Sequence, residues 1–572
     1  MCAVAACIPL GAAADTSPNG VYYTVAQDGL YFEQRNEYRG GAPYLVLVDA
    51  DYVEQLVIPD EVDGIPVKET ARFENRVDIE AVTLGVNMRQ IDFRNCKYIE
   101  SFDFNGVKNV GGYLRDLPAL GELTVPEGTS VDMSNLGVTK VVVEGQCGLY
   151  FAIRDCESLV DLTLPQGINY IPKFSRCTAL QKVEIPESVT VIPDDAFNGC
   201  TSLENITVPP MLKIIGNNAF SGTRISTFDC PESVQLICDG AFSGTRLTEF
   251  KFPASLLTSF SAYGSAYPVE EQLFNNKATA NANSIFADCY NLARLSYPTE
   301  EILLSIPPAF YQYSGLGRYL CNYDKRVELY IGDSPLTELT IPPSFKGANN
   351  ALQRTTNLQR LKIADSTGAI EFAGDFAYIP TLESVEIGAG APTFWGTFEG
   401  CENLKEVTVS PKNRTSELSY VFKGCKSLEY VEFPVVVTLR GELFEGCSSL
   451  KSVYFKKLTR IDGTATFKDC TSLEEIDFPR ANVTNGYELF RGCSSLRRVN
   501  MPQLSSVGSK MFLDCISLEE LNIPAATTRP SKVVCHCVSL TSQTSLRLNR
   551  MHSHIQVSTL LMSPKDVILP LL

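Results

Sequence analysis

The sequence predicts a solenoid of stacked repeats, each adding one strand to a long parallel β-sheet. A phrase of thirteen residues recurs, most clearly as FKGCKSLEYVEFP from Phe422, FKDCTSLEEIDFP from Phe467 and FLDCISLEELNIP from Phe512. Its cysteines lie at 425, 447, 470, 493 and 515, so successive copies are 22 or 23 residues apart. This period is typical of leucine-rich repeats. One repeat cannot bury its own apolar face, so we expect neighbouring repeats to share one elongated core.

The end of each repeat reads as a short strand with one buried face. Leu473, Ile476 and Phe478 are apolar, and the last two alternate with the acidic Glu475 and Asp477. Alternation with a period of two is typical of a half-buried strand. A proline follows and ends the strand, because its nitrogen has no hydrogen to donate to a neighbouring strand. We therefore expect a parallel sheet on the concave side of the solenoid.

The stretch between two predicted strands is too short and irregular for a helix of several turns. In SVTVIPDDAFNGC, which ends at Cys200, proline, aspartate and glycine interrupt the apolar residues. Short segments of this composition do not sustain a helix in water. We expect short turns, bridges or single helical turns on the convex side.

The position of the repeats predicts the domain organisation. Phased repeats run over residues 73–543. Residues 15–72 lack the phrase but contain alternating runs, so we expect an N-terminal β cap that covers the first open edge. Phasing loosens over 253–335, where two periods between Thr245 and Cys289 contain only one clear phrase. We expect a loop excursion there, and insertions in solenoids often lie on a binding face. Residues 544–572 form an atypical C-terminal tail.

The first fourteen residues, MCAVAACIPLGAAA, resemble the remnant of a secretory signal. A short apolar run before Ala12-x-Ala14 predicts cleavage after Ala14. The sequence before Cys7 also resembles a bacterial lipobox, which would make Cys7 a lipid anchor, and the third alternative is neither event. No other segment approaches the length of a membrane span.

The net charge makes two classes of binding partner improbable, and the cysteine positions predict free thiols. The formal net charge of −17 and a pI near 4.9 argue against nucleic acid or an anionic membrane as the main partner. Thirteen of the 19 cysteines recur at or near one slot of the repeat beside a phenylalanine. Side chains stacked in register have parallel Cβ vectors, which suit a disulfide poorly. We expect buried free thiols that pack as small hydrophobic residues.

The sequence gives little support to an enzyme or a cofactor. Histidine is absent from residues 1–535, so the solenoid body cannot hold a Ser-His or Cys-His nucleophilic site. A glycosidase uses a pair of carboxylates, and pairs are available at Glu474, Glu475 and Asp477, but solvated strands carry such pairs routinely. Cys535, Cys537, His552 and His554 match no strong metal motif. We therefore predict no catalytic residues, no metal and no cofactor.

The candidate binding residues are those that the alternation turns toward solvent on the predicted concave sheet. They form a mostly acidic surface with two tyrosines and one arginine, and tyrosine and arginine are enriched at interface hot spots. The alternative is a merely solvated strand face. The candidates are Glu406, Tyr430, Glu432, Tyr454, Glu475, Asp477, Arg498, Asn500, Glu520 and Asn522.

The phrase Phe-x-x-Cys-x-Ser-Leu-x-x-Val-x-Ile-Pro, with the upstream Val-x-x-Ile-x-x-x-Ala-Phe seen at Val189 to Phe197, resembles the BspA-like class of leucine-rich repeats. That class is known mainly from secreted and cell-surface proteins of bacteria. The resemblance implies an adhesin-like protein, secreted or surface-attached, that binds a host-matrix or cell-surface protein, with a glycan as the alternative partner. A structural surface spacer without a fixed ligand is the second function to consider, and a carbohydrate-active enzyme is a weaker third.

Overall fold

The computed structural model describes residues 15–16, 22–37, 41–148, 151–256, 285–305, 326–345, 352, 355–367 and 370–523. The predicted cleavage site, Cys7 and the tail 544–572 lie outside these ranges. The chain divides into two compact units. The N-terminal unit comprises residues 1–364 with 370–385, and the C-terminal unit comprises residues 365–369 with 386–572.

The predicted strands are present in both units and pair in parallel with those of neighbouring turns, which confirms the leucine-rich-repeat solenoid. We call these strands the repeat ladder. In the N-terminal unit it comprises β6 (Gln55–Val57), β10 (Ala81–Thr83), β12 (Ser101–Asp103), β14 (Glu122–Val125), β16 (Lys140–Val143), β18 (Asp161–Thr163), β19 (Lys182–Glu184), β21 (Asn205–Thr207), β24 (Glu249–Lys251), β25 (Arg294–Tyr297), β26 (Glu328–Ile331), β28 (Glu338–Ile341) and β29 (Arg360–Ile363). In the C-terminal unit it comprises β33 (Glu406–Val409), β35 (Tyr430–Glu432), β37 (Ser452–Tyr454), β39 (Glu475–Asp477), β41 (Arg498–Asn500) and β42 (Glu520–Asn522). The next strand of this series after β29 is β31 (Ser384–Ile387).

A second set of parallel strands lies in the stretch between the strands of the repeat ladder. Only turns, bridges or single helical turns were expected there from the sequence. We call this second set the second ladder. In the N-terminal unit it comprises β11 (Gln90–Arg94), β13 (Gly111–Leu117), β15 (Ser130–Leu136), β17 (Ala152–Arg154), β20 (Val191–Ile192), β22 (Ile214–Ile215), β23 (Leu236–Ile237) and β30 (Glu371–Ala373). In the C-terminal unit it comprises β32 (Thr393–Trp395), β34 (Glu417–Ser419), β36 (Thr438–Arg440), β38 (Arg460–Asp462) and β40 (Asn482–Val483).

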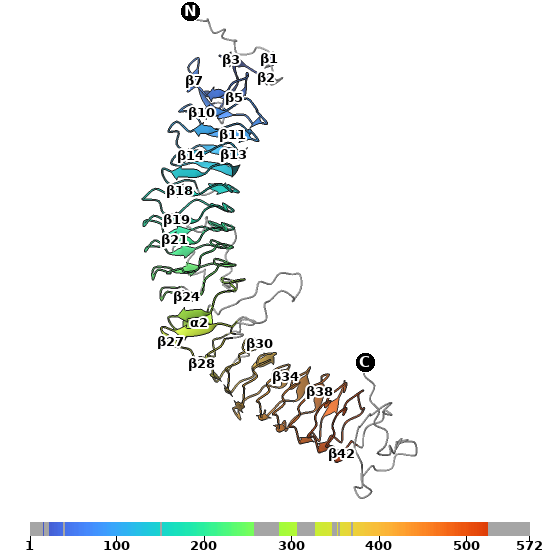
Figure 1. The fold of residues 1–572 in the computed structure, drawn as a ribbon. Coiled ribbons are helices and arrows are strands. Elements are labelled where there is room, and N and C mark those ends of the chain that lie inside the picture. The colour runs from blue at the N-terminus through green and yellow to red at the C-terminus, as the bar shows by residue number, and fades with distance from the viewer. Residues whose placement is uncertain are drawn as a thin grey trace, which may run out of the picture. The chain divides into compact units, whose positions relative to one another are not determined.

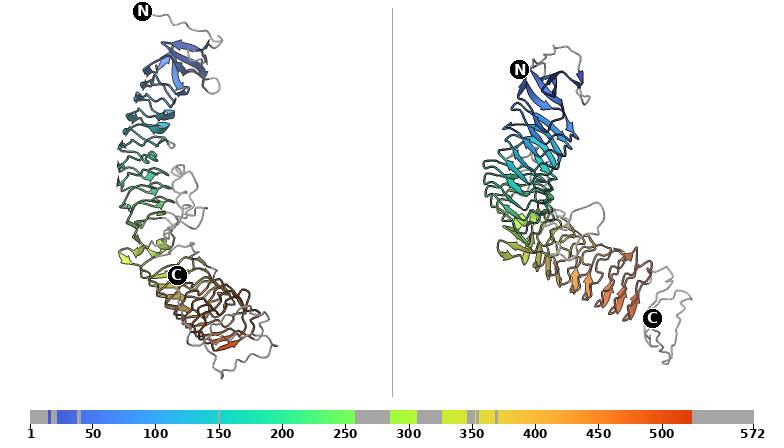
Figure 2. Two further views of the ribbon diagram at one scale, coloured as in Figure 1. Left: turned by 45° about the vertical axis from the view of Figure 1, so that its right-hand side comes forward. Right: turned by 45° about the horizontal axis from the view of Figure 1, so that its top comes forward.

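Many of the described turns therefore have a strand on two sides. Within the N-terminal unit, Figure 1 shows β18, β19 and β21 along one side of the stack and β11 and β13 along the other. The further views in Figure 2 follow the same succession of turns. The predicted turns are also present, as at residues 194–199 directly after β20. Two or three residues suffice for many of these strands, as at Val191–Ile192 and Ile214–Ile215, because the turns above and below supply their hydrogen bonds.

The N-terminal region contains antiparallel strands, whereas the strands within each ladder pair with one another in parallel. They are β1 (Asp15–Thr16), β2 (Tyr22–Tyr23), β3 (Val25–Gln27), β4 (Leu30–Asn36), β5 (Pro43–Ala50) and β7 (Glu61–Val62). β5 pairs in parallel with β8 (Ile65–Thr70), which pairs at Glu69 with Gln90 of β11, while β9 (Phe73–Glu74) also pairs with β11. We propose that residues 15–72 act as a cap, because this arrangement covers the edge of the first turn.

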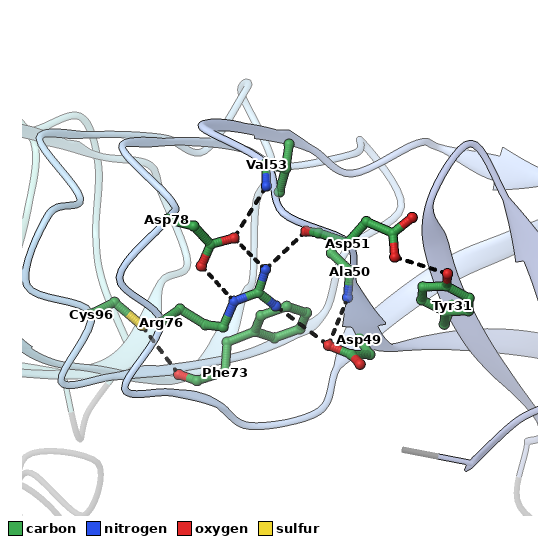
Figure 3. A network of polar contacts seen from close by, with 9 residues as sticks. All are labelled: Tyr31, Asp49, Ala50, Asp51, Val53, Phe73, Arg76, Asp78 and Cys96. Atoms are coloured by element: carbon green, nitrogen blue, oxygen red, sulfur yellow. Dashed lines mark hydrogen bonds and ion pairs between the residues drawn. The ribbon is translucent and has the colours of Figure 1, made fainter. Parts of the chain in front are cut away.

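Arg76 joins this region to the first repeat (Figure 3). In the copy FENRVDIEAVTLG it occupies the slot that holds cysteine elsewhere. Its guanidinium donates two hydrogen bonds to Asp78, at 2.8 and 2.6 Å, one to the Asp51 carbonyl at 3.0 Å and one to Asp49 at 3.3 Å. Asp78 also accepts the Val53 backbone N–H at 3.1 Å. Asp49 and Asp78 are buried, so the guanidinium compensates two carboxylates that would otherwise be costly to bury.

Stacked phenylalanines form the centre of each unit. In the N-terminal unit Phe174, Phe197, Phe220, Phe242 and Phe286 stack with centroid distances of 5.5 to 6.0 Å. In the C-terminal unit the stack comprises Phe398, Phe422, Phe444, Phe467, Phe490 and Phe512, with distances of 5.3 to 5.9 Å. All these rings are buried, and the offset between parallel rings gives attraction beyond the area removed from water.

The cysteine slot lies beside this stack, and the thiols described by the structure are free, as predicted. Their burial is also confirmed, although Cys230, which lies outside the slot, is only half-buried. Desolvation raises the pKa of the Cys200 thiol to about 12, so this thiol stays protonated. The predicted slot at Cys537 lies outside the described residues.

The residue before the cysteine slot adopts a left-handed backbone in turn after turn. It is glycine at 424 and 446, with φ of 75° and 77°, and aspartate at 469 and 514, with φ of 59° and 64°. Glycine adopts this region without steric cost, and aspartate tolerates it better than most residues. This requirement explains why the phrase alternates between FxGC and FxDC.

The irregular region retains the stacking of the repeats. Phe242 packs directly on Phe286 at 6.0 Å, and Glu249 of β24 pairs with Arg294 of β25. The turns on either side of residues 257–284 are therefore neighbours, as a loop excursion requires, and only one period is present where the spacing allows two. Within the described residues this region also contains α2 (Glu300–Ser305) and β27 (Ser334–Pro335), which pairs antiparallel with β26.

Candidate binding face

The ten predicted site residues all lie on the repeat ladder of the C-terminal unit. Glu406 belongs to β33, and the other nine belong to β35, β37, β39, β41 and β42. Nine of them are exposed and Asn500 is half-buried, while the residue between two of them, such as Val431 or Ile476, is buried. The alternation predicted from the sequence is thus confirmed. We call the outward residues of β33, β35, β37, β39, β41 and β42 the ladder face.

Two exposed tyrosines mark the middle of the ladder face. The exposed fractions of Tyr430 and Tyr454 are 45% and 49%. Tyr430 pairs across the sheet with Ser452, and Glu432 pairs with Tyr454, so the two rings lie diagonally on adjacent strands. The Tyr430 hydroxyl donates a hydrogen bond of 2.7 Å to Glu432. Desolvation, together with this carboxylate, raises the pKa of Tyr430 to about 12, so the phenol stays neutral and can act as a donor.

Polar side chains on the remaining strands of the ladder face pair with one another. Arg498 forms an ion pair with Glu475 on the adjacent strand. Asp477 accepts a hydrogen bond of 2.6 Å from the Asn500 amide, whose oxygen in turn accepts one of 2.7 Å from Asn522. Such cross-strand pairs stabilise adjacent strands by a few tenths of a kcal/mol to ~1 kcal/mol each. Arg498 therefore contributes no uncompensated positive charge to the face.

The residues considered for catalysis lie within the described structure, and those considered for metal binding lie outside it. Glu475 and Asp477, two of the carboxylates considered for a glycosidase, both have polar partners on β41. Among the described residues there is no cluster of three or more His, Cys, Asp or Glu side chains that could hold a metal ion. Cys535, Cys537, His552 and His554 lie outside the described residues. No helix in the described ranges is long and apolar enough to cross a membrane.

A second outward surface with aromatic residues was not predicted from the sequence. Trp395 is the only tryptophan of the chain and ends β32, and Tyr420 follows β34. Both lie on the second ladder, where no strand was expected and no outward positions were therefore assigned. The available signal was the rarity of tryptophan itself, since a single indole in a repeat cannot be part of the repeated core.

The fold and its outward strands define a leucine-rich-repeat protein. A family model described as BspA type leucine rich repeat region (6 copies) matches residues 150–266, 213–319, 329–438 and 418–541. These matches cover more than half of the chain, which therefore belongs to the BspA-type leucine-rich-repeat family, as the repeat phrase indicated.

The chain also aligns with solved structures of other leucine-rich-repeat proteins. A leucine-rich repeat protein from Bacteroides ovatus is 17% identical, with 83% of this chain and 99% of that chain covered and a TM-score of 0.29. A leucine rich cell surface protein from Faecalibacterium prausnitzii is 19% identical, with 83% and 94% covered and a TM-score of 0.22. A leucine-rich repeat protein from Eubacterium ventriosum is 18% identical, with 62% and 85% covered and a TM-score of 0.33. No curated protein matches the chain.

Proposed function

We propose that this chain is a secreted or surface-attached bacterial protein that binds a protein partner through the ladder face and carries out no chemistry. The observation that carries the proposal is the pair of half-exposed tyrosines, Tyr430 and Tyr454, on adjacent rigid strands. Exposed tyrosines on a preorganised sheet supply contact area and a polar tip at low entropic cost. The surface location is supported by membership of a family known mainly from secreted and surface proteins.

The charge of the ladder face indicates what the partner presents. Among the candidate residues are five carboxylates and one guanidinium, and that guanidinium is already paired with Glu475. Opposite charges across an interface raise the association rate and discriminate against wrong partners. The partner should therefore present a basic surface, such as an exposed patch of lysine and arginine on a matrix or cell-surface protein.

The test compares ladder-face variants with a control on another part of the same unit. The double variant Tyr430→Ala/Tyr454→Ala is expected to weaken capture of purified matrix proteins with basic surfaces by at least about tenfold, as loss of a hot spot does. Tyr487→Ala removes a tyrosine of similar exposure, 43%, that lies outside the repeat ladder, and should leave capture unchanged. Binding should also weaken as salt is raised, because exposed charges are screened.

Three outcomes would overturn the proposal. The first is full binding by the double variant, because the ladder face would then not be the interface. The second is an intact protein that captures no matrix or cell-surface protein, which would favour the structural spacer. The third is hydrolysis of a glycan that is lost in Glu475→Gln, which would restore the carbohydrate-active enzyme.

A further inference from the structure

Trp395 departs from the pattern of the surface on which it lies. In the C-terminal unit the second ladder aligns Trp395 with Ser419, Arg440 and Asp462 on successive strands. The other three residues of this row are polar, and Ser419 among them is buried, whereas the indole is apolar and 53% exposed. Exposing a large apolar side chain costs free energy, so an indole in this position is more informative than one in a core.

Tyr420 lies next to Trp395 in a conformation that its residue type disfavours. Its φ is 55°, in the left-handed region, and the aligned residues on the neighbouring strands are Gly396 and Gly441, with φ of 59° and 64°. A bulky residue in this region is a steric outlier that typically costs about 1–3 kcal/mol, and such strain concentrates at functional sites. The ring meets Trp395 edge to face, with centroids 6.1 Å apart.

Gly441 provides the space for the tyrosine ring. An ideal Cβ at this glycine would lie 2.3 Å from a ring carbon of Tyr420, so any other residue would displace the ring. The side chain therefore lies against the backbone of the next strand beside the indole. Two aromatic rings and two glycines form a platform on the outward side of β32, β34 and β36, which we call the aromatic platform.

Charged groups of both signs lie beside the aromatic platform. The Arg440 guanidinium forms an ion pair of 2.6 Å with Glu417, and Asp462 forms one with Arg460. These groups lie on β34, β36 and β38, adjoining the two rings. The Glu399 carboxylate also lies beside Gly396, with its Oε2 3.7 Å from an ideal Cβ at that glycine. Groups of both signs offer hydrogen-bond donors and acceptors to an uncharged ligand.

We propose that the aromatic platform is a subsite for a neutral oligosaccharide with β-linked pyranose rings. A pyranose whose hydroxyl groups are equatorial has a flat apolar face of C–H groups, which stacks on an indole. Its hydroxyl groups point outward around the ring edge, where paired carboxylates and guanidinium groups can exchange hydrogen bonds with them. This goes beyond the proposed function, because it uses the second ladder and a different class of ligand.

The test is calorimetric titration of the intact protein with cellotetraose and with chitotetraose. Binding to at least one of them is expected, with a Kd on the order of 1 mM, as for a shallow site with one or two stacked rings. Trp395→Ala and Tyr420→Ala should each weaken this binding by about tenfold or more. Trp395→Phe should restore part of it, because a ring remains. In the wild type the single tryptophan also gives a spectroscopic signal, since a stacked sugar should change its emission.

The controls separate this subsite from the ladder face. Tyr454→Ala should bind the same oligosaccharides as the wild type, with the same affinity, and Trp395→Ala should capture a protein partner normally. Gly441→Ala, which displaces the tyrosine ring, should weaken sugar binding while Trp395 is intact. The proposal is wrong if neither oligosaccharide binds or changes the tryptophan emission, or if Trp395→Ala binds as the wild type does. A platform that instead captures a protein through Trp395 would also overturn it.

Discussion

The cysteine slot of the repeat holds a hydrogen-bond donor as well as a small apolar group. The Cys470 thiol donates to the carbonyl of Phe444, one turn earlier, at 3.1 Å, and the same carbonyl accepts the Cys447 backbone N–H at 3.0 Å. The equivalent contact recurs at other turns, as from Cys200 to Phe174 at 2.9 Å. Thr223 also donates from this slot, but to the Phe220 carbonyl of its own turn. The sequence indicated a buried small residue there, but the bond between turns depends on the stacking and was not predicted.

Substitution of Cys470 separates the two roles of the slot. A purely apolar slot would tolerate alanine better than serine, because a buried hydroxyl without a partner is costly. A donor slot reverses this order, since serine can still donate to the Phe444 carbonyl. We expect Cys470→Ser to be more stable than Cys470→Ala by on the order of 1 kcal/mol, measured as a shift of the urea midpoint. The opposite order would show that the sulfur contributes by packing alone.

The strands were predictable where the sequence repeats strictly and less so elsewhere. The strand of the repeat ladder follows from alternation over several residues, as at Glu475 to Phe478. β20 and β22 contain only two residues each, Val191–Ile192 and Ile214–Ile215, and a dipeptide has no periodicity to recognise. Their pairing becomes favourable only once adjacent turns are in register. β32 and β34 contain three residues each, but they lack the recurring phrase that marks the repeat ladder, so the outward positions of the aromatic platform were not predicted.

In the first repeat, Arg76 occupies the cysteine position of the repeat phrase and Asp78 occupies the serine position. Hydrogen bonds from Arg76 hold the pKa of Asp78 below its ordinary value. A carboxylate with a lowered pKa in the folded state stabilises the protein at neutral pH. This contribution is lost as the pH falls below about 4 and through the lowered pKa. The pair thus holds the guanidinium that contacts Asp49 of β5, except in strong acid.

Removal of the charge at Arg76 should loosen the cap. Arg76→Met keeps the length of the side chain but leaves Asp49 and Asp78 buried without their cation, which typically costs about 3–5 kcal/mol. We expect faster hydrogen exchange at the amides of β5 and β8 at pH 7. Arg224→Met breaks an exposed pair with Glu204 and should change exchange little. Unchanged exchange in Arg76→Met would mean that backbone pairing alone holds the cap.

At the scale of the whole molecule, repetition made the fold predictable and left the binding properties to the residues that vary. The phrase alone predicts the stack, the buried rings and the outward positions of Tyr430 and Tyr454. It does not predict that Arg498 is neutralised by Glu475, because that contact joins two repeats whose outward residues are unrelated in sequence. The spacing alone also does not show that the turns of Phe242 and Phe286 are direct neighbours. An insertion as long as one repeat gives the same spacing as a repeat whose phrase is not recognisable.

Because each turn packs mainly on its two neighbours, the stack also predicts how far the effect of a core substitution spreads. Phe444 is buried and stacks on Phe422 at 5.6 Å and on Phe467 at 5.3 Å, so Phe444→Ala should cost about 3–5 kcal/mol. In a solenoid each turn depends mainly on the turns beside it. Hydrogen exchange should therefore accelerate in residues 422–433 and 467–478 and remain unchanged in residues 191–215.

The matched control for Phe444→Ala is Tyr454→Ala, which removes an exposed ring of the same unit and should leave exchange unchanged at all three places. Acceleration of equal size near Phe444 and in residues 191–215 would show that the chain unfolds as one cooperative block. A response confined to the neighbouring turns means instead that the ladder face and the cap can be altered independently. The binding variants could then be interpreted without loss of the distant repeats.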